Sequence, residues 1–210
     1  MHGNSSSRCE AIPEIKYLLP KNITIFAFDF SGCGHSEGEY ISLGWHEQDD
    51  VECIVNFLRK SNKVSTIGLW GRSMGAVTAL MYGSKDLSIA GLVLDSPFSS
   101  LKLLINELAK DRVALPDFII KQAITWIKEI IKEKADFDLD DIEPREYASK
   151  CYIPAFFVIQ KEIHLSIFII LRIYLVYMLE IKILFMLKEI IIQKGLYILK
   201  ILSLFFFIKH

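Results

Sequence analysis

The sequence shows no marked excess of charge and no cysteine motif. Its 24 Lys and Arg residues nearly balance 25 Asp and Glu residues, and the net charge of −1 gives no electrostatic basis for binding nucleic acid. The four cysteines have neither CxxC nor Cys/His spacing, which argues against a zinc site and a disulfide framework. No charged-then-apolar secretory segment opens the chain, which favours a cytoplasmic protein with free thiols. We therefore predict no metal, no cofactor and no nucleic-acid partner.

The C-terminal part of the chain lacks nearly all small and turn-forming residues. Residues 165–210 contain one glycine, no alanine and no proline, although the whole chain has 11 glycines and 6 prolines. Ile, Leu, Phe, Lys and Tyr dominate, and the charges would point all round a helix rather than to one face. A/T-rich non-coding DNA tends to encode these residue types. Our first hypothesis is that residues 161–210 are an apolar, irregularly helical tail of non-native origin, translated from an intron or in a shifted frame.

A membrane segment is the competing interpretation of this tail. Residues 163–179 and 196–208 are mainly apolar, but Arg172 interrupts the first stretch and Lys200 the second. A spanning helix needs roughly 20 apolar residues, and an arginine at its centre costs about 2.5–3.5 kcal/mol. We keep membrane association through residues 163–208 as an alternative.

The most informative motif is Gly71-Arg72-Ser73-Met74-Gly75. It follows an apolar, strand-like run at residues 64–70 and precedes a helix-like run at residues 76–82. A turn of this kind holds the central serine in a strained conformation at the start of the helix, and a Cβ at either glycine would clash with the neighbouring strand or helix. The pattern is typical of a nucleophilic serine. The alternative is a glycine-rich turn that holds an inert serine.

Other motifs surround this turn in a definite order. His2-Gly3-Asn4 opens the chain, and a predicted strand at residues 23–28 leads into the turn Asp29-Phe30-Ser31-Gly32-Cys33-Gly34-His35-Ser36. Further strands are predicted at residues 89–95, followed by Ser96-Pro97-Phe98, and at residues 153–159. Apolar residues at helical spacing predict three helices, carried by Ile12, Ile15 and Leu19, by Val51, Ile54, Val55 and Leu58, and, after Pro116, by Ile120, Ala123, Ile124, Ile127 and Ile131.

Taken together, these motifs resemble the α/β-hydrolase superfamily, and within it the serine-aminopeptidase-like and depalmitoylase-like serine hydrolases. The resemblance covers residues 2 to about 160. It implies an α/β fold in which a mostly parallel sheet is flanked by helices, here as a partial α/β-hydrolase domain over residues 1–160. A cap-like segment would occupy residues 99–150, and the apolar tail would follow from residue 161.

The resemblance also implies an activity. Such enzymes attack an ester, thioester or amide with a serine, and a histidine oriented by Asp or Glu serves as the base. Ser73 would be the nucleophile, and the backbone N–H groups of Asn4 and Met74 would form the oxyanion hole. The substrate would be a small molecule or an acylated protein.

The sequence departs from the family pattern at two places. The family has a strand that leads into the His-Gly-X loop and lies between the predicted strands at 23–28 and 64–70, and we expect that strand to be missing. After the strand at 153–159 the family has Gly, two residues and the catalytic Asp, whereas this chain has Gln160-Lys161-Glu162-Ile163-His164.

Candidates for the missing acid and base are Glu162, Asp95 and His210. None of them fits the family's spacing, so we predict a serine hydrolase with impaired turnover. The alternative is a non-catalytic, membrane-associated protein that keeps the hydrolase scaffold for binding.

Overall fold

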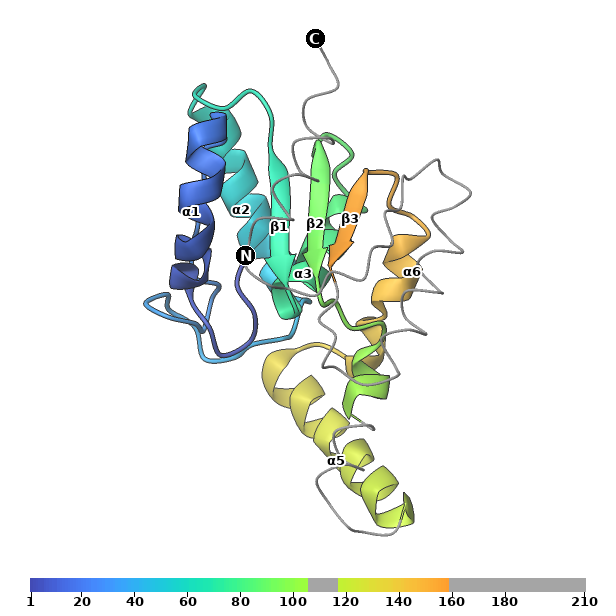
Figure 1. Cartoon of the computed structure of the whole chain (residues 1–210). Helices are drawn as coiled ribbons and strands as arrows, with labels where there is room; N and C mark the ends of the chain where they lie inside the picture. The colour runs from blue at the N-terminus through green and yellow to red at the C-terminus, as the bar shows by residue number, and fades with distance from the viewer. Residues whose placement is uncertain (106–116, 159–210) are drawn as a thin grey trace.

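The computed structural model describes residues 1–105 and 117–158 (Figure 1). Its helices and strands, in chain order, are η1 (Arg8–Ala11), α1 (Ile12–Leu18), η2 (Leu19–Lys21), α2 (Glu47–Lys60), β1 (Gly68–Arg72), α3 (Met74–Gly83), β2 (Gly91–Asp95), α5 (Asp117–Ala135), η3 (Leu139–Asp141), α6 (Pro144–Ala148) and β3 (Ala155–Val158). A short helical segment at residues 101–105 precedes the first gap.

The three strands form one parallel sheet in the order β1-β2-β3. Gly68 of β1 lies opposite Gly91 of β2, and Arg72 lies opposite Asp95, so the two strands end at the same edge. The strands predicted at residues 64–70, 89–95 and 153–159 are therefore present, with shorter bounds. The first runs from Gly68 to Arg72, so it begins later than predicted and ends two residues later. These strands and their flanking helices confirm the predicted partial α/β-hydrolase fold.

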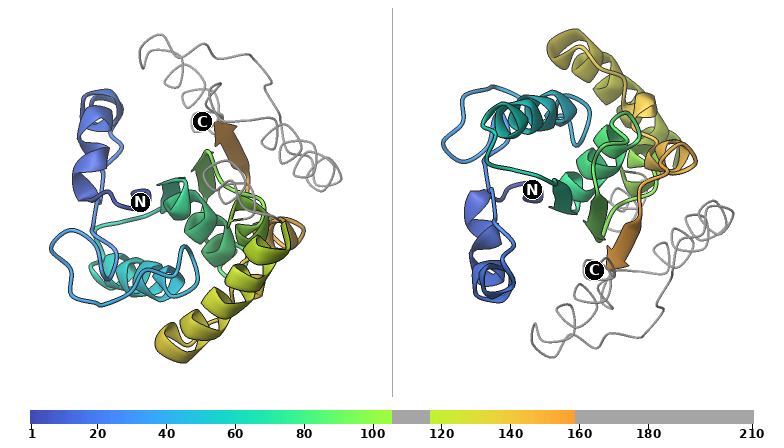
Figure 2. Two further views of the ribbon diagram at one scale, coloured as in Figure 1. Left: turned by 90° about the horizontal axis from the view of Figure 1, so that it is seen from below. Right: turned by 90° about the horizontal axis from the view of Figure 1, so that it is seen from above.

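Alternate side chains along the sheet face two separate apolar clusters. Leu92 and Leu94 of β2 pack on the side of α3, while Val93 between them packs with Leu18 of α1 on the other side. Each strand of this sheet is thus apolar on both faces, as expected for parallel strands covered by helices on both sides. Figure 2 shows α1 and α3 on opposite sides of the sheet.

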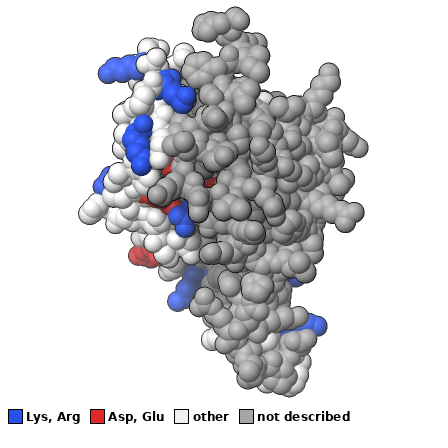
Figure 3. Space-filling model, viewed as in Figure 1, with Lys and Arg blue, Asp and Glu red and all other residues white. Residues whose placement is uncertain are grey.

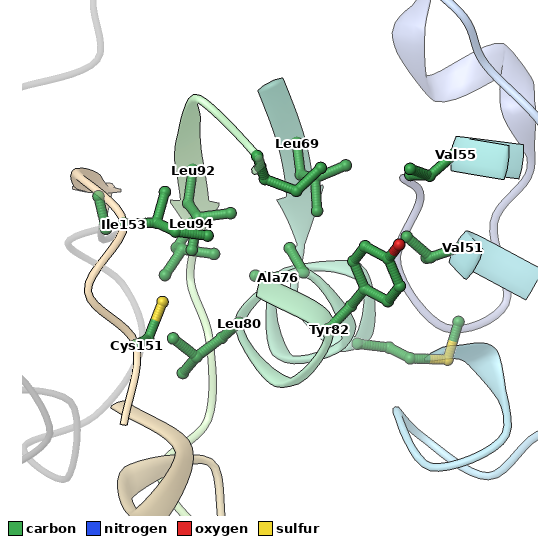
Figure 4. Close-up of a cluster of buried hydrophobic side chains, with 14 of the residues drawn as sticks. Val51, Val55, Leu69, Ala76, Leu80, Tyr82, Leu92, Leu94, Cys151 and Ile153 are labelled. Atoms are coloured by element: carbon green, nitrogen blue, oxygen red, sulfur yellow. The ribbon is translucent and has the colours of Figure 1, made fainter. Parts of the chain in front are cut away.

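The helix α3 is the centre of the larger cluster. All of its residues are buried, and α2 and α6 pack against it. Figure 4 shows Leu80 of this helix near Leu94 and Cys151, whereas Tyr82 lies on the other side, towards the α2 residues Val51 and Val55. A helix that is apolar all round is stable only when neighbours cover every face. The predicted helices at residues 51–58 and 76–82 are confirmed as α2 and α3.

The strand predicted at residues 23–28 is not formed. The segment is extended, with Ile23 and Ile25 against the β1–β3 face and Phe26 46% exposed, but it joins no ladder. The neighbouring position on β1 is taken by Met1, whose backbone hydrogen-bonds Trp70 and Arg72. Apolar character alone does not make a strand when the segment has no partner backbone to pair with.

The helix predicted around residues 12–19 is present as α1, but the predicted apolar side is not its buried side. Ile12, Ile15 and Leu19 are 59%, 40% and 52% exposed, and the buried contact is made by Leu18. The described residues form only three strands, and the buried apolar contact between α1 and these strands is made by Leu18. Periodicity identified the helix here, and the neighbours available to it decided which residues are buried.

The segment between β2 and β3 carries α5, which extends away from the sheet (Figures 1 and 2). Ile120 is buried, whereas Ile127 is 42% and Trp126 63% exposed, so the predicted apolar stripe is only partly covered. A second group of buried side chains, including Phe98, Phe137 and Ile142, joins this segment to Val77 and Met81 of α3. Pro116 lies outside the described residues. So does the chain from residue 159 onward, which includes the tail for which a non-native origin and a membrane segment were the two interpretations.

The surface and the thiols are unremarkable in the part of the chain that the structure describes. Basic and acidic side chains are interspersed on the face shown in Figure 3. Cys33 and Cys151 are buried, Cys9 and Cys53 are exposed, and all four are free. Within residues 1–105 and 117–158, no helix has the length and apolar character needed to cross a membrane.

A polar cluster at the end of α3 fastens this helix to α2. Asp86 accepts hydrogen bonds from the Tyr82 hydroxyl and the Arg59 guanidinium, both at 2.9 Å, and from the N–H and hydroxyl of Ser88 at 3.0 and 2.7 Å. Burial raises the pKa of Asp86, but the hydrogen bonds from Ser88, Tyr82 and Arg59 outweigh it and lower the pKa to about 2. The same contact and burial raise the pKa of Tyr82 to about 12.

This cluster gives a pH-dependent contribution to stability. Because the pKa of Asp86 is lower in the folded chain, its stabilisation is present above pH 3.8 and is lost as the pH falls towards about 2. We expect Asp86→Asn to lower the free energy of unfolding by about 1 kcal/mol at pH 7, a value that allows for solvent screening. Urea denaturation at pH 7, 4 and 2.5 should show this difference shrinking towards the lowest pH. Glu133→Gln, which removes an exposed charge on α5, is the control and should show no such trend.

Candidate active site

Ser73 lies between the last residue of β1 and the first residue of α3, in an unusual backbone conformation. Its φ is 50° and its ψ is −114°, a region that residues with a Cβ rarely adopt. Its N–H donates to the Asp95 carbonyl at 2.8 Å, and its carbonyl accepts from the N–H groups of Ala76 and Val77 at 3.0 and 3.1 Å. In the described part of the chain the Ser73 hydroxyl has no hydrogen-bond partner.

The two glycines of the motif are required by close backbone contacts. A Cβ on Gly71 would lie 2.0 Å from the carbonyl oxygen of Gly75, and a Cβ on Gly75 would lie 2.6 Å from that of Met1. Both are shorter than any normal contact, and the opposing atoms are backbone atoms that cannot rotate away. Gly71 lets the strand approach the first turn of the helix, as expected from the motif. Gly75 instead lets the helix approach the first residues of the chain, a contact that the motif did not predict.

The first residues of the chain lie against β1 and Ser73. The Met1 α-amino group donates to the Trp70 carbonyl at 2.6 Å, and the Arg72 N–H donates to the Met1 carbonyl at 3.2 Å. A Cβ built on Gly3 would lie 3.7 Å from the Cβ of Ser73. The structure thus brings the His2-Gly3-Asn4 motif beside the serine motif, although they are 70 residues apart.

The buried His2 ring fixes this loop from within. The Phe30 N–H donates to His2 Nε2 at 3.1 Å, so the ring proton is on Nδ1, which donates to the Gly3 carbonyl at 2.8 Å. The Ser6 N–H also donates to the Gly3 carbonyl, at 3.3 Å. This bond closes a β-turn over Gly3–Ser6, and Ser5 at its third position has a φ of 58°.

Two backbone N–H groups remain available beside Ser73. Met74 is the first residue of α3, so its N–H has no acceptor inside the helix. Asn4 is the second residue of the turn, and its N–H has no acceptor among the described residues. The N-terminus of a helix favours negative charge, so the Met74 N–H lies at a position where the helix dipole would stabilise an anionic group.

Glu10 and Arg72 are a pair that sequence reasoning missed. Glu10 Oε2 accepts from the Gly3 N–H at 2.8 Å, and Glu10 Oε1 contacts the Arg72 guanidinium. The Glu10 side chain is 19% exposed and that of Arg72 53%. No spacing rule relates these three residues, which lie on separate segments, so a single sequence offers no signal for the contact.

The turn after residue 28 is organised by Asp29. Its buried carboxylate accepts from the Arg8 N–H at 2.6 Å and from the His35 N–H at 3.1 Å, and the Arg8 guanidinium lies 3.4 Å away. These two N–H groups hold the pKa of Asp29 below its usual value. Gly34, at a φ of 55°, has no room for a Cβ because the Asp29 carboxylate would lie 2.4 Å from it. Asp29 therefore ties the loop before α1 to the turn that supports His2.

Asp95, a predicted candidate for the acid, ends β2 at the same edge of the sheet as Ser73. Burial raises the pKa of its carboxyl group, while the Ser96 hydroxyl, which donates to Oδ1 at 2.8 Å, and the nearby Arg72 charge oppose this. The pKa of Glu14 on α1 is also raised, first by burial and then by the charge of Asp95. Asp95 thus lies near Arg72, in addition to Glu10, and Glu14 lies near Asp95.

No base for Ser73 is found among the described residues. Both ring nitrogens of His2 are engaged, His46 Nε2 bonds the Ala135 carbonyl at 2.7 Å, and His35 is exposed. The other predicted candidates, Glu162 and His210, lie outside the described residues. The described chain therefore brings together Ser73, Asn4, Met74 and Asp95.

The close backbone contact at Gly75 predicts that replacing this glycine by alanine lowers the stability of the fold. We expect Gly75→Ala to lower the free energy of unfolding by about 1–3 kcal/mol, because the Met1 and His2 carbonyls would have to move. Gly83→Ala is the matched control on the same helix, since its Cβ would meet only side-chain methyl groups, at 3.2 and 3.3 Å. Urea denaturation of both variants checks this, and equal losses would contradict the contact.

The conformation of Ser73 predicts that glycine is favoured there over alanine. Both Ser73→Gly and Ser73→Ala remove the hydroxyl, but only glycine relieves the strain at a φ of 50°. After allowing for the greater flexibility of unfolded glycine, we expect Ser73→Gly to be more stable than Ser73→Ala by about 1 kcal/mol. Thermal unfolding measures the difference. If Ser73→Ala is equally or more stable, the backbone is not strained.

Solved structures of hydrolases share this fold. The chain superposes on the esterase Pf2001 of Pyrococcus furiosus with a TM-score of 0.62 and 25% identity, covering 84% of this chain and 66% of that chain. An alpha/beta hydrolase from Sphaerobacter thermophilus DSM 20745 matches with a TM-score of 0.55 and 15% identity, covering 84% of this chain and 79% of that chain. The second likeness is evidence for the fold alone.

Two curated bacterial proteins are similar in sequence. The uncharacterized protein YqkD of Bacillus subtilis (strain 168) is 24% identical over 164 residues, which are 77% of this chain and 53% of that protein. The uncharacterized protein YfhR of Escherichia coli (strain K12) is 30% identical over 111 residues, or 51% of this chain and 38% of that protein. The matched regions thus span about half of one relative and less of the other.

The family model that matches the chain covers the sheet edge, the serine motif and the N-terminal loop. It is the model described as serine aminopeptidase, S33, and it matches residues 1–139. This range contains the Ser73 turn, the His2–Asn4 loop and the first two strands, which are the features assembled above. The chain belongs to the serine aminopeptidase S33 family of α/β-hydrolases.

Proposed function

We propose that the protein is a serine hydrolase in which Ser73 is the nucleophile and the N–H groups of Asn4 and Met74 form the oxyanion hole. The observation that carries this proposal is the position of Ser73. It sits at a φ of 50° at the start of α3, with the backbone of Gly3 alongside its Cβ. Membership of the serine aminopeptidase S33 family supports the reaction class.

The proposed reaction has two stages. The Ser73 oxygen attacks the substrate carbonyl, and the resulting oxyanion accepts hydrogen bonds from Asn4 and Met74. Collapse of this intermediate breaks the bond to the leaving group, which takes a proton from solvent and departs as alcohol, thiol or amine, and an acyl group remains on Ser73. Water then attacks the acyl carbonyl, which releases the carboxylic acid and restores the Ser73 hydroxyl. Because no histidine contacts Ser73 among the described residues, the proton of the attacking hydroxyl leaves to solvent. We therefore propose low turnover, since an oxyanion hole without a base retains only about 10³–10⁴-fold catalysis over water.

Esters are the first substrates to test. The Pyrococcus furiosus protein that shares the fold is an esterase, and an ester with a good leaving group depends least on a base. Thioesters and amides, on small molecules or on acylated proteins, remain within the proposed class. Asp95 is the acid that we propose among the described residues, because its carboxyl group lies at the same sheet edge as Ser73.

Covalent labelling with a fluorophosphonate tests the nucleophile directly. The full 210-residue chain is expected to be labelled at Ser73, and Ser73→Ala should abolish this labelling. The labelling rate should be about a thousandfold below that of an intact serine hydrolase measured in parallel, because no histidine contacts Ser73 among the described residues. Mass spectrometry of the labelled peptide locates the modified residue.

Three results separate the parts of the proposal. Ser149→Ala should be labelled like the wild type and serves as the control for loss of a hydroxyl outside the proposed site, since the hydroxyl of the partly exposed Ser149 donates to the Glu146 carbonyl. Labelling that persists in Ser73→Ala would reject Ser73 as the nucleophile. A rate equal to that of the intact hydrolase would reject low turnover while keeping Ser73 as the nucleophile.

A further inference from the structure

We propose that Glu10 is a positioning residue for the oxyanion loop, and that Arg72 holds its carboxylate and balances its charge. This inference rests on the proposed function, because the loop it acts on carries the N–H of Asn4. The structural basis is one carboxylate with two contacts. Glu10 Oε2 accepts from the Gly3 N–H at 2.8 Å, and Glu10 Oε1 contacts the Arg72 guanidinium.

Gly3 is the residue of this loop that most needs an external support. Glycine has no Cβ and rotates about its backbone bonds more freely than any other residue. Its carbonyl is already held by His2 Nδ1 at 2.8 Å and by the Ser6 N–H at 3.3 Å. The peptide plane is rigid and trans, so the orientation of this carbonyl also sets the direction of the Asn4 N–H.

The bond to Glu10 fixes the peptide on the other side of Gly3. With both peptide groups held, the two backbone torsions of Gly3 have no freedom left, and the Asn4 N–H keeps one direction relative to Ser73. If Glu10 is removed, the carbonyl side alone restrains the glycine. The loop would then turn away from the position beside Ser73 for part of the time.

Arg72 links this support to the nucleophile. It directly precedes Ser73, its N–H donates to the Met1 carbonyl at 3.2 Å, and its side chain contacts Glu10. A lone carboxylate so close to an oxyanion site would repel the developing negative charge. Arg72 cancels that charge and leaves the carboxylate free to accept from Gly3. Because its side chain is 53% exposed, the ion pair adds little to folding stability.

Exchanging the two charged residues distinguishes a role of Glu10 in positioning the Gly3 N–H from a role in the ion pair alone. Glu10→Arg combined with Arg72→Glu restores an ion pair but leaves no acceptor for the Gly3 N–H, since arginine only donates. Glu10→Gln keeps an acceptor oxygen and removes the charge. Glu10→Ala removes both, and Glu39→Ala is the control for loss of an exposed negative charge elsewhere.

Fluorophosphonate labelling of Ser73 in the full chain is the first measurement. We expect Glu10→Ala and the exchanged pair to react about ten- to a hundredfold more slowly than the wild type, because a donor moved by about 1 Å loses most of its effect. Glu10→Gln should recover most of that loss, and Glu39→Ala should match the wild type. A wild-type rate in Glu10→Ala, or full recovery in the exchanged pair, would overturn the positioning role.

Amide hydrogen exchange at Gly3 is the second measurement and does not depend on catalysis. The Gly3 N–H should be protected in the wild type and in Glu10→Gln, and should exchange rapidly in Glu10→Ala and in the exchanged pair. If Ser73 is never labelled, the proposed function fails, while this measurement still decides whether Glu10 holds the loop. A Gly3 amide that exchanges rapidly in the wild type would overturn the inference, as would one equally protected in Glu10→Ala. Thermal unfolding of each variant excludes loss of the fold as the cause.

Discussion

The close approach of β1, α3 and the first residues of the chain is the constraint on which the rest of the site depends. Gly71 and Gly75 leave no room for a Cβ, so three backbone segments meet where side chains normally keep them apart. This packing places the first turn of α3 at the carboxyl edge of the sheet. Ser73 then has to turn from strand to helix within one residue, which is why it carries a φ of 50°. The packing of α3, which is buried along its whole length, offsets the energetic cost of this backbone conformation.

The fold could be predicted from the sequence where the signal was local. Strands β1, β2 and β3 and helices α2 and α3 were marked by runs and periods of apolar residues that their own segments carry. The prediction was wrong at residues 23–28, where an equally apolar run finds no backbone partner, and for the buried side of α1, where Leu18 rather than Ile15 contacts the sheet. Pairing and burial depend on which neighbours are present, and periodicity does not contain that information.

In the candidate site, too, the residues with a local sequence signal could be predicted and the others could not. The sequence indicated Ser73 and the His2–Asn4 loop because each forms a short contiguous motif with a known geometry. It gave no indication of Glu10, which contacts a residue 62 positions away, and it marked Asp29 as the start of a turn without indicating that its carboxylate ties Arg8 to His35. Both act on backbone N–H groups, which every residue possesses. A hydrogen bond from a side chain to a backbone group therefore does not constrain the residue type of its partner. Such a contact can be found only in the folded structure.

The charges near Ser73 bear on the proposed oxyanion site. The carboxyl groups of Glu10 and Asp95 lie close to Arg72, the residue before Ser73, and the carboxyl group of Glu14 lies close to Asp95. The compensating groups are the N-terminus of α3, the available N–H groups and the guanidinium of Arg72. Burial raises the pKa of Asp95 and of Glu14, so their charged forms are disfavoured, and Glu10 is paired with Arg72. Arg72 is therefore more than a spacer between Gly71 and Ser73. In the proposed site, its guanidinium is the charge that would make the acidic surrounding compatible with an oxyanion.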